Sequence, residues 1–528
     1  MLIGYVSDEW DMAIVGALLE LEGASGQVVN VSSSPTGAVR ADVAPGSWTV
    51  TLHAAGHGPK QVQVELVEGA PIRFRLLSER LYGYVWPKWT TSGGTGELCV
   101  HAPIAHHVSL WRYGWKRELV SHIGDFDDHP PGSLAQMLPD GDVAALGARW
   151  NRTGYATPAV DPRIHQVAPA EHGLHLVHVE TADGRSTSFP WVVAPAAPRH
   201  RIAVLTSSLS WNAYNDFGGR SNYVSAQRLP ATPTVTARQD LVWFSDPEHP
   251  PWVYTDYDPL SFNRPEPVNE VPLRGSITDP IDVRGGEHVA PAEWRLIGWM
   301  EREGFDHDVY ADAQLDEGGL DLDAYDIVII STHPEYWTTA MLDTLQSWVT
   351  ERGGKLAYLG GNGIHGPVRI DGDLMTCLNG DSFDGGPSRM EQLHRSEAEL
   401  LGVQTTFSGY ETGAPYRVVD ADHWIFDGTG LANGDLFGSE SLDRRAVGGA
   451  SGHETDKWTA DTPPGARLLA KGTNPDDGGG EMTAITFDGG GEVFSVGSIS
   501  YTCAIAVDPD ISQITAKLLT RWLGPPAA

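Results

Sequence analysis

The sequence has few cysteines, few basic residues and no long apolar run. Three cysteines among 528 residues are too few and too scattered for a disulfide framework or a cysteine-based zinc site. Asp and Glu number 69 against 36 Lys and Arg, and the net charge of −33 disfavours binding to nucleic acid or to an anionic membrane surface. No apolar run reaches about 18 residues, so we expect no membrane-spanning helix.

The first residues also lack the features of an export signal. Residues 1–8 have neither a basic segment nor an apolar core, so no signal peptide is expected. Together with the scattered cysteines, this favours a reducing, cytoplasmic location. A chain of 528 residues exceeds one ordinary domain, and a hydrophobic fraction of 41% is sufficient for several cores.

Residues 1–78 are predicted to form a small β-domain. Apolar and polar residues alternate on both sides of the turn Pro45-Gly46, and Trp48, Val50 and Leu52 share one face after it. This pattern resembles the transthyretin-like modules of the carboxypeptidase-regulatory type. Such modules are usually scaffolds, so we expect no chemistry here.

Residues 79–197 are predicted to form a second β-domain, a sandwich of short strands separated by Gly, Pro and Asp turns. Aromatic residues are frequent in it, at Tyr82, Tyr84, Trp86, Trp89, Trp111, Tyr113 and Trp115. An aromatic belt can bind carbohydrate, although such residues more often belong to a core. The segment 194–198, Ala-Pro-Ala-Ala-Pro, is a stiff linker and marks a boundary.

Residues 198–528 change to an α/β pattern. Unbroken apolar runs, typical of strands buried on both faces, alternate with segments of helical periodicity. The predicted strands are 201–205, 326–330, 355–359 and 493–496. The predicted helices are 291–303, 342–349 and 511–523. This alternation predicts a parallel, doubly wound sheet, so the fold class is multidomain α+β with two β-sandwich modules before an α/β domain. A long Pro-rich insertion at 214–289 is expected to line a functional site.

The most informative motif follows the apolar run at 326–330. The segment His333-Pro334-Glu335-Tyr336-Trp337 places an imidazole, a carboxylate and a phenol where that strand ends. Ligands of open α/β sheets bind beyond the carboxyl ends of their strands. A phenolate is a hard oxygen donor, so if Tyr336 binds a metal, ferric iron is the first choice.

Two glycine-rich turns carry further candidates. Asn362 stands in Gly360-Gly361-Asn362-Gly363 directly after a predicted strand, where a hydrolase elbow would carry a nucleophile. An amide is no nucleophile, but Asn362 and nearby N–H groups could orient a carbonyl oxygen. His453 and Glu454 form the second candidate, a general acid–base pair in a glycine-rich loop.

A third candidate segment follows the first strand of the predicted sheet. The residues Trp211-Asn212-Ala213-Tyr214-Asn215 therefore also belong to its carboxyl edge. Amides and phenols bind polar ligands without titrating near neutral pH. We expect Asn212, Tyr214 and Asn215 to bind substrate, together with Trp337 from the motif above.

These segments, in this order, resemble the large subunit of N,N-dimethylformamidase in its C-terminal glutamine-amidotransferase-like domain. The matching residues are Trp211–Asn215 with Gly218-Gly219, Thr332–Trp337, Gly360–Gly363, the Gly-x-Glu-x-Asp at Gly452–Asp456, and Val493–Ile499. The preceding sandwich fits the family too. Everything except the N-terminal module is covered by the resemblance, which implies a class I glutamine-amidotransferase-like, flavodoxin-like fold for 198–528.

The resemblance implies a mononuclear Fe³⁺ site that hydrolyses a small amide. The family builds this site from two tyrosines and a glutamate. Tyr336 is the matching tyrosine ligand, and Glu454 matches the acid–base residue. The glutamate is expected after the Gly-Gly-Asn-Gly turn, where Asp381 and Glu391 stand, and the second tyrosine aligns near Trp294, where this chain has none.

Three hypotheses remain open from the sequence. The first is a metal-dependent hydrolase of a small N-substituted amide or formamide. The second is a non-catalytic protein that binds carbohydrate or another protein. The third is a metal-free hydrolase of an ester or cyclic amide that uses His333 and Glu335. A homo-oligomer and a small accessory subunit are the expected partners, in addition to the small amide substrate.

Overall fold

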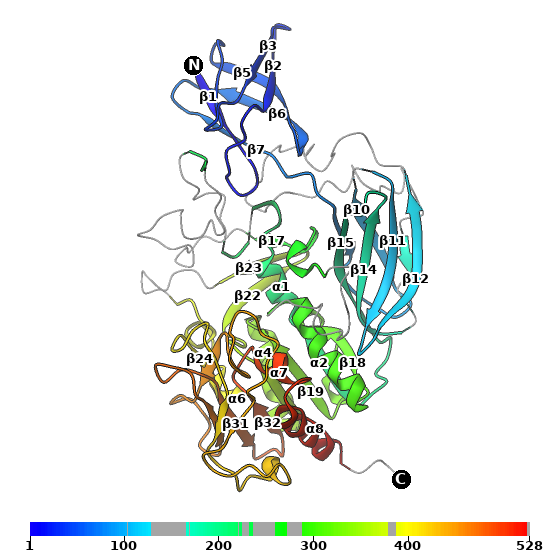
Figure 1. Ribbon diagram of the computed structural model, residues 1–528, viewed down its shortest axis with the longest axis vertical. Coiled ribbons are helices and arrows are strands. Elements are labelled where there is room, and N and C mark those ends of the chain that lie inside the picture. The colour runs from blue at the N-terminus through cyan, green and yellow to red at the C-terminus, as the bar shows by residue number, and fades with distance from the viewer. Residues whose placement is uncertain are drawn as a thin grey trace.

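The computed structural model describes residues 1–102, 104–127, 165–167, 169, 171–219, 221–223, 232–235, 259–271, 288–378 and 387–524. These residues form three groups of sheets that follow one another along the chain (Figure 1). The strand-rich, multidomain organisation predicted from the sequence is confirmed. The boundaries at residues 78 and 197 stay predictions.

The first group, blue in Figure 1, contains two sheets with the strand orders β4-β1-β7 and β3-β2-β5-β6. Its strands are β1 Leu2–Ser7, β2 Leu18–Gly23, β3 Val28–Ser32, β4 Ala38–Arg40, β5 Gly46–Ala54, β6 His57–Leu66 and β7 Ile72–Arg75. Trp48, Val50 and Leu52 all point into the core between the sheets, as the alternation in β5 predicts.

The second group contains sheets of order β13-β10-β8 and β12-β11-β14-β15-β9. Its strands are β8 Tyr82–Trp86, β9 Trp89–Thr91, β10 Thr95–His101, β11 His106–Tyr113, β12 Arg117–Phe126, β13 His165–Val167, β14 Gly173–Thr181 and β15 Ser186–Ala194. Several of its aromatic residues face the third group. Trp89 donates to Glu317, and the Arg302 guanidinium lies over the ring of Trp115. These rings therefore form part of the junction between the two groups.

The third group is built on one nine-stranded sheet. Five parallel strands come first in space, β18 Asp308–Ala311, β16 Ile202–Thr206, β19 Ile327–Thr332, β21 Lys355–Gly360 and β32 Glu492–Ser495. Four antiparallel strands continue the sheet, β31 Glu481–Thr486, β30 Arg467–Gly472, β26 Tyr416–Val418 and β27 Leu436–Phe437. The sequence predicted only parallel strands, because the antiparallel strands lack the unbroken apolar runs that mark the buried parallel ones.

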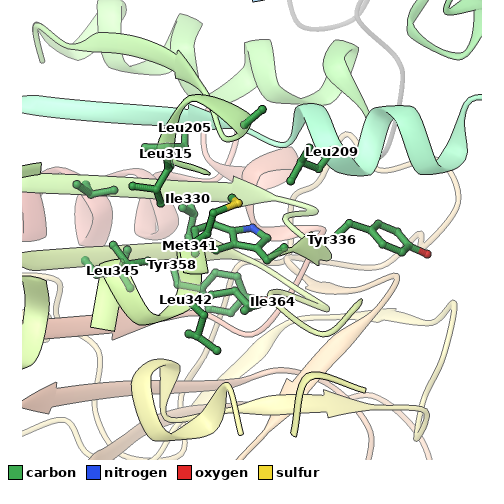
Figure 2. Close-up of a cluster of buried hydrophobic side chains, with 14 of the residues drawn as sticks. Leu205, Leu209, Leu315, Ile330, Tyr336, Met341, Leu342, Leu345, Tyr358 and Ile364 are labelled. Carbon is green, nitrogen blue, oxygen red and sulfur yellow. The ribbon is translucent and has the colours of Figure 1, made fainter. Parts of the chain in front are cut away.

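Helices cover both faces of the parallel strands. On one face, α4 (Thr339–Arg352) packs Leu342 and Leu345 against Ile330 of β19, as Figure 2 shows. On the other face, α2 (Ala290–Glu303) and α8 (Pro509–Leu523) pack against Ile329 and its neighbours. Consecutive residues of β19 therefore point into two different cores, which explains its unbroken apolar sequence.

Shorter elements surround the carboxyl ends of these strands. The helices are α1 Ser208–Tyr214, α3 Ala313–Asp316, α5 Met390–Leu393, α6 Ala398–Leu401 and α7 Tyr501–Ala504. The strands are β17 Leu260–Ser261, β20 Tyr336–Trp337, β22 Gly366–Asp371, β23 Leu374–Cys377, β24 Gln404–Thr406, β25 Gly413–Ala414, β28 Ser451–Gly452 and β29 Thr455–Lys457. Within the described residues, no helix has both the length and the apolar character needed to span a membrane.

Candidate functional site

Polar side chains from four segments meet at the carboxyl ends of the parallel strands. His333 and Glu335 follow β19, and Asn362 follows β21. Glu454 lies in the turn between β28 and β29, and Tyr214 ends α1, the helix that follows β16. Strand ends in such sheets commonly bind ligands. We call His333, Glu335, Asn362 and Glu454 the strand-end cluster.

The imidazole of His333 lies between two carboxylates. Its Nε2 atom is 3.0 Å from Glu454 Oε2 and 3.2 Å from Glu335 Oε2. Its Nδ1 atom is 3.2 Å from Nδ1 of His288. The side chain of His333 is 1% exposed and that of Glu454 is 14% exposed, so solvent reaches the cluster on the Glu454 side. The ligand atoms of His333, Glu335 and Glu454 lie within 4.8 Å of one another, a spacing at which they could hold a metal ion.

The two carboxylates decide the charge of His333. Burial by itself would lower the pKa of His333, but Glu454 and Glu335 outweigh burial and raise that pKa to about 10. Burial would likewise raise the pKa of Glu454, yet the nearby His333 cation lowers it below its usual range. Near neutral pH the proton of this group is therefore on the imidazole, and Glu454 is ionised.

Two further imidazoles beside the cluster are held neutral. Burial, followed by the charge of His333, lowers the pKa of His288 well below its usual value. Burial lowers the pKa of His453 to about 4. The two rings contact each other edge to face, with centroids 5.4 Å apart. Among the described residues, no hydrogen-bond partner reaches the buried Nδ1 atom of His453.

Asn362 connects the cluster to a second layer of hydrogen bonds. Its Nδ2 atom donates to Glu454 Oε2 at 2.6 Å and lies 3.2 Å from His333 Nε2. Its Oδ1 atom accepts from the hydroxyl of Thr405 at 2.8 Å, and its backbone N–H donates to Asp456 Oδ1 at 2.8 Å. The side chain of Asn362 is therefore fixed from both ends, with its amide nitrogen directed at Glu454.

Three tyrosines form the opposite wall of the site. The Tyr214 hydroxyl donates to Glu335 Oε2 at 2.8 Å, and its ring centroid is 4.8 Å from that of Tyr223. The hydroxyl of Tyr336 is 2.7 Å from that of Tyr223 and accepts from Asn222 Nδ2 at 2.7 Å. Burial, with the charge of Glu335, raises the pKa of all three phenols well above the usual value. Figure 2 shows Tyr336 at the edge of the core, with its hydroxyl pointing away from the leucines.

The backbone is strained at three positions beside these side chains. Thr332, Asn362 and His453 have φ angles of 63°, 52° and 67°, in the left-handed region that favours glycine. A β-branched residue such as Thr332 is especially rare there. Such conformations persist where the surrounding structure enforces them, and they occur preferentially at functional sites.

Three of the predicted substrate-binding residues, Asn212, Asn215 and Trp337, make contacts within the fold. Asn212 Nδ2 donates to Leu260 O at 3.4 Å, and Asn215 Nδ2 donates to Pro265 O at 2.8 Å. The indole of Trp337 is fully buried in the core against α4. Of the predicted substrate-binding residues, Tyr214 alone contacts the strand-end cluster. The buried amides of Asn212 and Asn215 hold the segments after β16 in place.

The predicted metal ligands are spread over different places. Tyr336 lies in the wall of tyrosines described above. Glu391 is exposed on α5 and accepts a hydrogen bond from Gln404, so the structure does not bring it to the cluster. Asp381 lies outside the described residues. Glu335, which was predicted as a catalytic residue, accepts a hydrogen bond from the Tyr214 hydroxyl.

Sequence reasoning missed His288 and Thr405. His288 lies at the end of the long insertion, just before α2, with no motif around it. Thr405 is on β24, which pairs with β29, and it lies opposite Asp456. A hydroxyl in a short polar strand carries no signal of its own. The pairing of β24 with a strand about 50 residues later is what places it there.

An imidazole held between two carboxylates at the ends of parallel strands defines a site equipped for acid–base chemistry on a bound ligand. The family model described as N,N-dimethylformamidase beta subunit-like, C-terminal matches residues 107–514. The chain therefore belongs to the N,N-dimethylformamidase beta subunit-like family, and the resemblance recognised in its sequence is confirmed.

The N,N-dimethylformamidase beta subunit of Paracoccus aminophilus is 27% identical, over 44% of this chain and 37% of that protein. The corresponding beta subunit of an Alcaligenes species is 25% identical over the same shares. The match thus spans little more than a third of the length of these curated relatives.

Solved structures give only weak likenesses. A DUF3823 family protein from Parabacteroides merdae has a TM-score of 0.12 and 14% identity, over 35% of this chain and 88% of that one. The Bacillus anthracis TIE protein has a TM-score of 0.13 and 13% identity, over 39% of this chain and 37% of that one.

Proposed function

We propose that the chain is a metal-dependent hydrolase of a small N-substituted amide, with N,N-dimethylformamide as the first substrate to test. The observation that carries this proposal is the buried imidazole of His333 between Glu335 and Glu454, next to the amide of Asn362. Imidazole and carboxylate pairs move protons, and fixed N–H donors stabilise a developing oxyanion. Membership of the family supports the same class of reaction.

Glu454 is the general base in this proposal. Its carboxylate is ionised near neutral pH, and its side chain is more exposed than those of His333 and Glu335. The carboxylate accepts a proton from water as the water oxygen bonds to the carbonyl carbon. The carbon–nitrogen bond then breaks, and the proton passes to the departing amine. Water and amide are consumed, and a carboxylic acid and an amine are released.

His333 and Asn362 have different tasks. The Nε2–H of the His333 imidazolium lies between Glu454 and Glu335, at 3.0 and 3.2 Å, so His333 keeps the Glu454 carboxylate ionised and in place. Asn362 is a positioning residue, because its amide holds the Glu454 carboxylate at 2.6 Å and is itself fixed by Thr405. We do not assign the role of general base to His453, because its ring lies against His288 and its pKa is about 4.

The donors present fit the iron ion that the resemblance implies. Phenolate and carboxylate oxygens are hard ligands, which suit ferric iron. Tyr214 Oη and Glu335 Oε2 are 2.8 Å apart, and the buried Oδ1 of Asn222 beside the tyrosines has no partner among the described residues. We assign Tyr214, Glu335 and one of Tyr223 and Tyr336 as its ligands. When bound, iron supplies polarisation of the carbonyl and a lower pKa for water.

The topology supports the fold that the resemblance implies. The parallel strands lie in the order β18-β16-β19-β21-β32, which is the 2-1-3-4-5 order of flavodoxin-like sheets. We therefore propose a flavodoxin-like, glutamine-amidotransferase-like domain for residues 198–528. The curated relatives are beta subunits, so we also propose a small accessory subunit. A homo-oligomer and a cytoplasmic location remain proposals from the sequence.

Metal content and the visible absorption spectrum of the purified protein test the proposed metal dependence. The purified full chain is expected to hold about one iron per chain and to show a phenolate-to-iron charge-transfer band. Tyr214→Phe should lose the iron, the band and amide hydrolysis together. Tyr336→Phe decides whether the second ligand is Tyr336 or Tyr223. A Tyr214→Phe variant with full iron content and full turnover would contradict the ligand assignment, and chelator-resistant turnover of the parent would contradict metal dependence.

A further inference from the structure

A second cluster of imidazole and carboxylate groups lies far from the strand-end cluster in the fold. His172 precedes β14 of the second group of sheets, His200 precedes β16, and Asp308 begins β18 of the third group. One ligand atom from each lies within 4.8 Å of the other two. We call these three residues the His-His-Asp cluster. It lies where β14 and β15 of the second group contact β18 of the third.

The two carboxylate oxygens of Asp308 differ in their hydrogen bonding. The carboxylate is completely buried. Its Oδ2 atom accepts from the backbone N–H groups of Arg199 at 2.8 Å and His200 at 3.3 Å, and from the Tyr325 hydroxyl at 2.8 Å. No hydrogen bond reaches its Oδ1 atom from the described part of the chain. A buried carboxylate oxygen without a donor is costly, so it calls for a cation.

Both imidazoles face this same oxygen. His172 Nε2 is 3.3 Å from Asp308 Oδ1, and His200 Nε2 is 4.0 Å from it. Ligand atoms bound tetrahedrally at about 2.0–2.1 Å from zinc lie about 3.3 Å apart, so His172 already has this spacing and His200 needs a small shift. The buried Nδ1 atom of His172 has no partner within the described residues.

The cluster is open on one side to a cavity. His172 and His200 are 12% and 29% exposed, and both line a cavity of about 400 Å³ between the second and third groups of sheets. Arg112, Glu171 and Glu301 also line it. Water from this cavity can occupy a fourth coordination position, which three protein ligands leave open.

We propose that His172, His200 and Asp308 bind one divalent transition-metal ion, zinc by preference, that links the second and third groups of sheets. Two imidazoles and one carboxylate with an open position are a common zinc set, and Fe²⁺ accepts the same donors. Hydrogen bonds from Tyr325 and two backbone N–H groups orient the carboxylate, as outer partners of metal ligands do. The proposal is independent of the proposed hydrolysis, because the two clusters share no residue.

Zinc binding to the metal-stripped full chain tests this site. The strand-end cluster could also take zinc, so the titration uses the Glu335→Gln variant as the parent protein. Calorimetry should show about one zinc per chain, and Fe²⁺ is titrated separately under anaerobic conditions to identify the preferred ion. Adding His172→Ala should weaken zinc binding at least tenfold and remove the rise in melting temperature that zinc causes.

A matched control is available on the same group of sheets. His107 Nδ1 is 2.8 Å from Asp125 Oδ1, and His107 Nε2 is 3.0 Å from His122 Nδ1. The Asp125 carboxylate is exposed, unlike that of Asp308. His107→Ala should leave zinc affinity unchanged. His200→Gln, at a more exposed position, replaces His172→Ala if that variant fails to fold. Zinc affinity equal in the His172, His200 and His107 variants, or no binding of either metal by the parent, would overturn the proposal.

Discussion

The strand-end cluster and the His-His-Asp cluster use the same side-chain types with opposite results. His333 lies within 3.2 Å of two carboxylates, and they raise its pKa to about 10 despite burial. His172 has one carboxylate within 3.3 Å, with His200 and Arg199 beside it, and there burial prevails and lowers its pKa to about 4. The balance of carboxylates and cationic neighbours around each imidazole decides whether a buried cluster keeps a proton.

The two clusters also use histidine in two different ways. In the strand-end cluster a proton is held between groups that open to solvent on the Glu454 side. In the His-His-Asp cluster the imidazole nitrogens are free to bind a cation between two parts of the fold. Changes in the first cluster should therefore affect turnover, and changes in the second should affect metal binding and stability.

The largest expected effect is that of Glu335→Gln. This carboxylate contacts both His333 and the Tyr214 hydroxyl, so its loss removes a charge partner and a proposed iron ligand together. Amide hydrolysis should fall by at least about 10³-fold. His172→Gln in the other cluster should leave turnover within about twofold. The losses are measured as steady-state rates of amine release. Equal losses in Glu335→Gln and His172→Gln would contradict the assignment of the reaction to the strand-end cluster.

Asn362→Ala should lower kcat by about 10²-fold, because the amide that holds Glu454 is lost. Residue 362 has a φ angle of 52°, so alanine at this position also has a strained backbone, which could itself lower kcat. Asn362→Gly relieves the strain and lacks the amide as well. Both variants should lose kcat alike while KM changes little. A glycine variant with normal kcat would assign the effect to the backbone rather than to the side chain.

Much of this architecture could be predicted from the sequence. The apolar runs that became β16, β19 and β21 identified the buried sheet, and the residues after them gave His333, Glu335 and Asn362. The antiparallel strands β26 and β27 were missed because strands of two or three residues have no periodicity. His172, His200 and Asp308 carry no local signal either. They stand in separate turns and strands, and only tertiary packing brings them together.

Acid should destabilise the second group of sheets. Burial lowers the pKa of His175 to about 4 and that of His178 to about 3. Below a pH of about 6.5 the unfolded chain binds protons that the folded chain excludes, so stability falls as pH falls toward these values. The expected loss is about 1.4 kcal/mol for each pH unit and each histidine.

Urea unfolding at pH 7.5 and pH 5 measures this effect. The glutamine of His175→Gln cannot titrate, so this variant should reduce the change in the free energy of unfolding with pH by about the contribution of one histidine. A wild-type slope retained in His175→Gln would assign the acid sensitivity to other groups.

The smallest expected effect is that of Thr405→Val. The Thr405 hydroxyl donates to Asn362 Oδ1 at 2.8 Å, two contacts away from the reacting atoms. Its removal should lower kcat by a few-fold, because the amide of Asn362 is held less firmly. Thr406→Val, at the next position of β24, should change nothing. Equal kcat values for the two variants would remove Thr405 from the positioning network.

The rate of dimethylamine release from N,N-dimethylformamide by wild type and Glu454→Gln tests the central claim most directly. Glutamine keeps the size of the side chain and its contact with Asn362, but it cannot accept a proton from water. We expect measurable turnover in wild type and a loss of about 10²–10⁴-fold in Glu454→Gln, with iron content unchanged. Turnover that is equal in the two proteins would contradict the role of the strand-end cluster as the reaction centre.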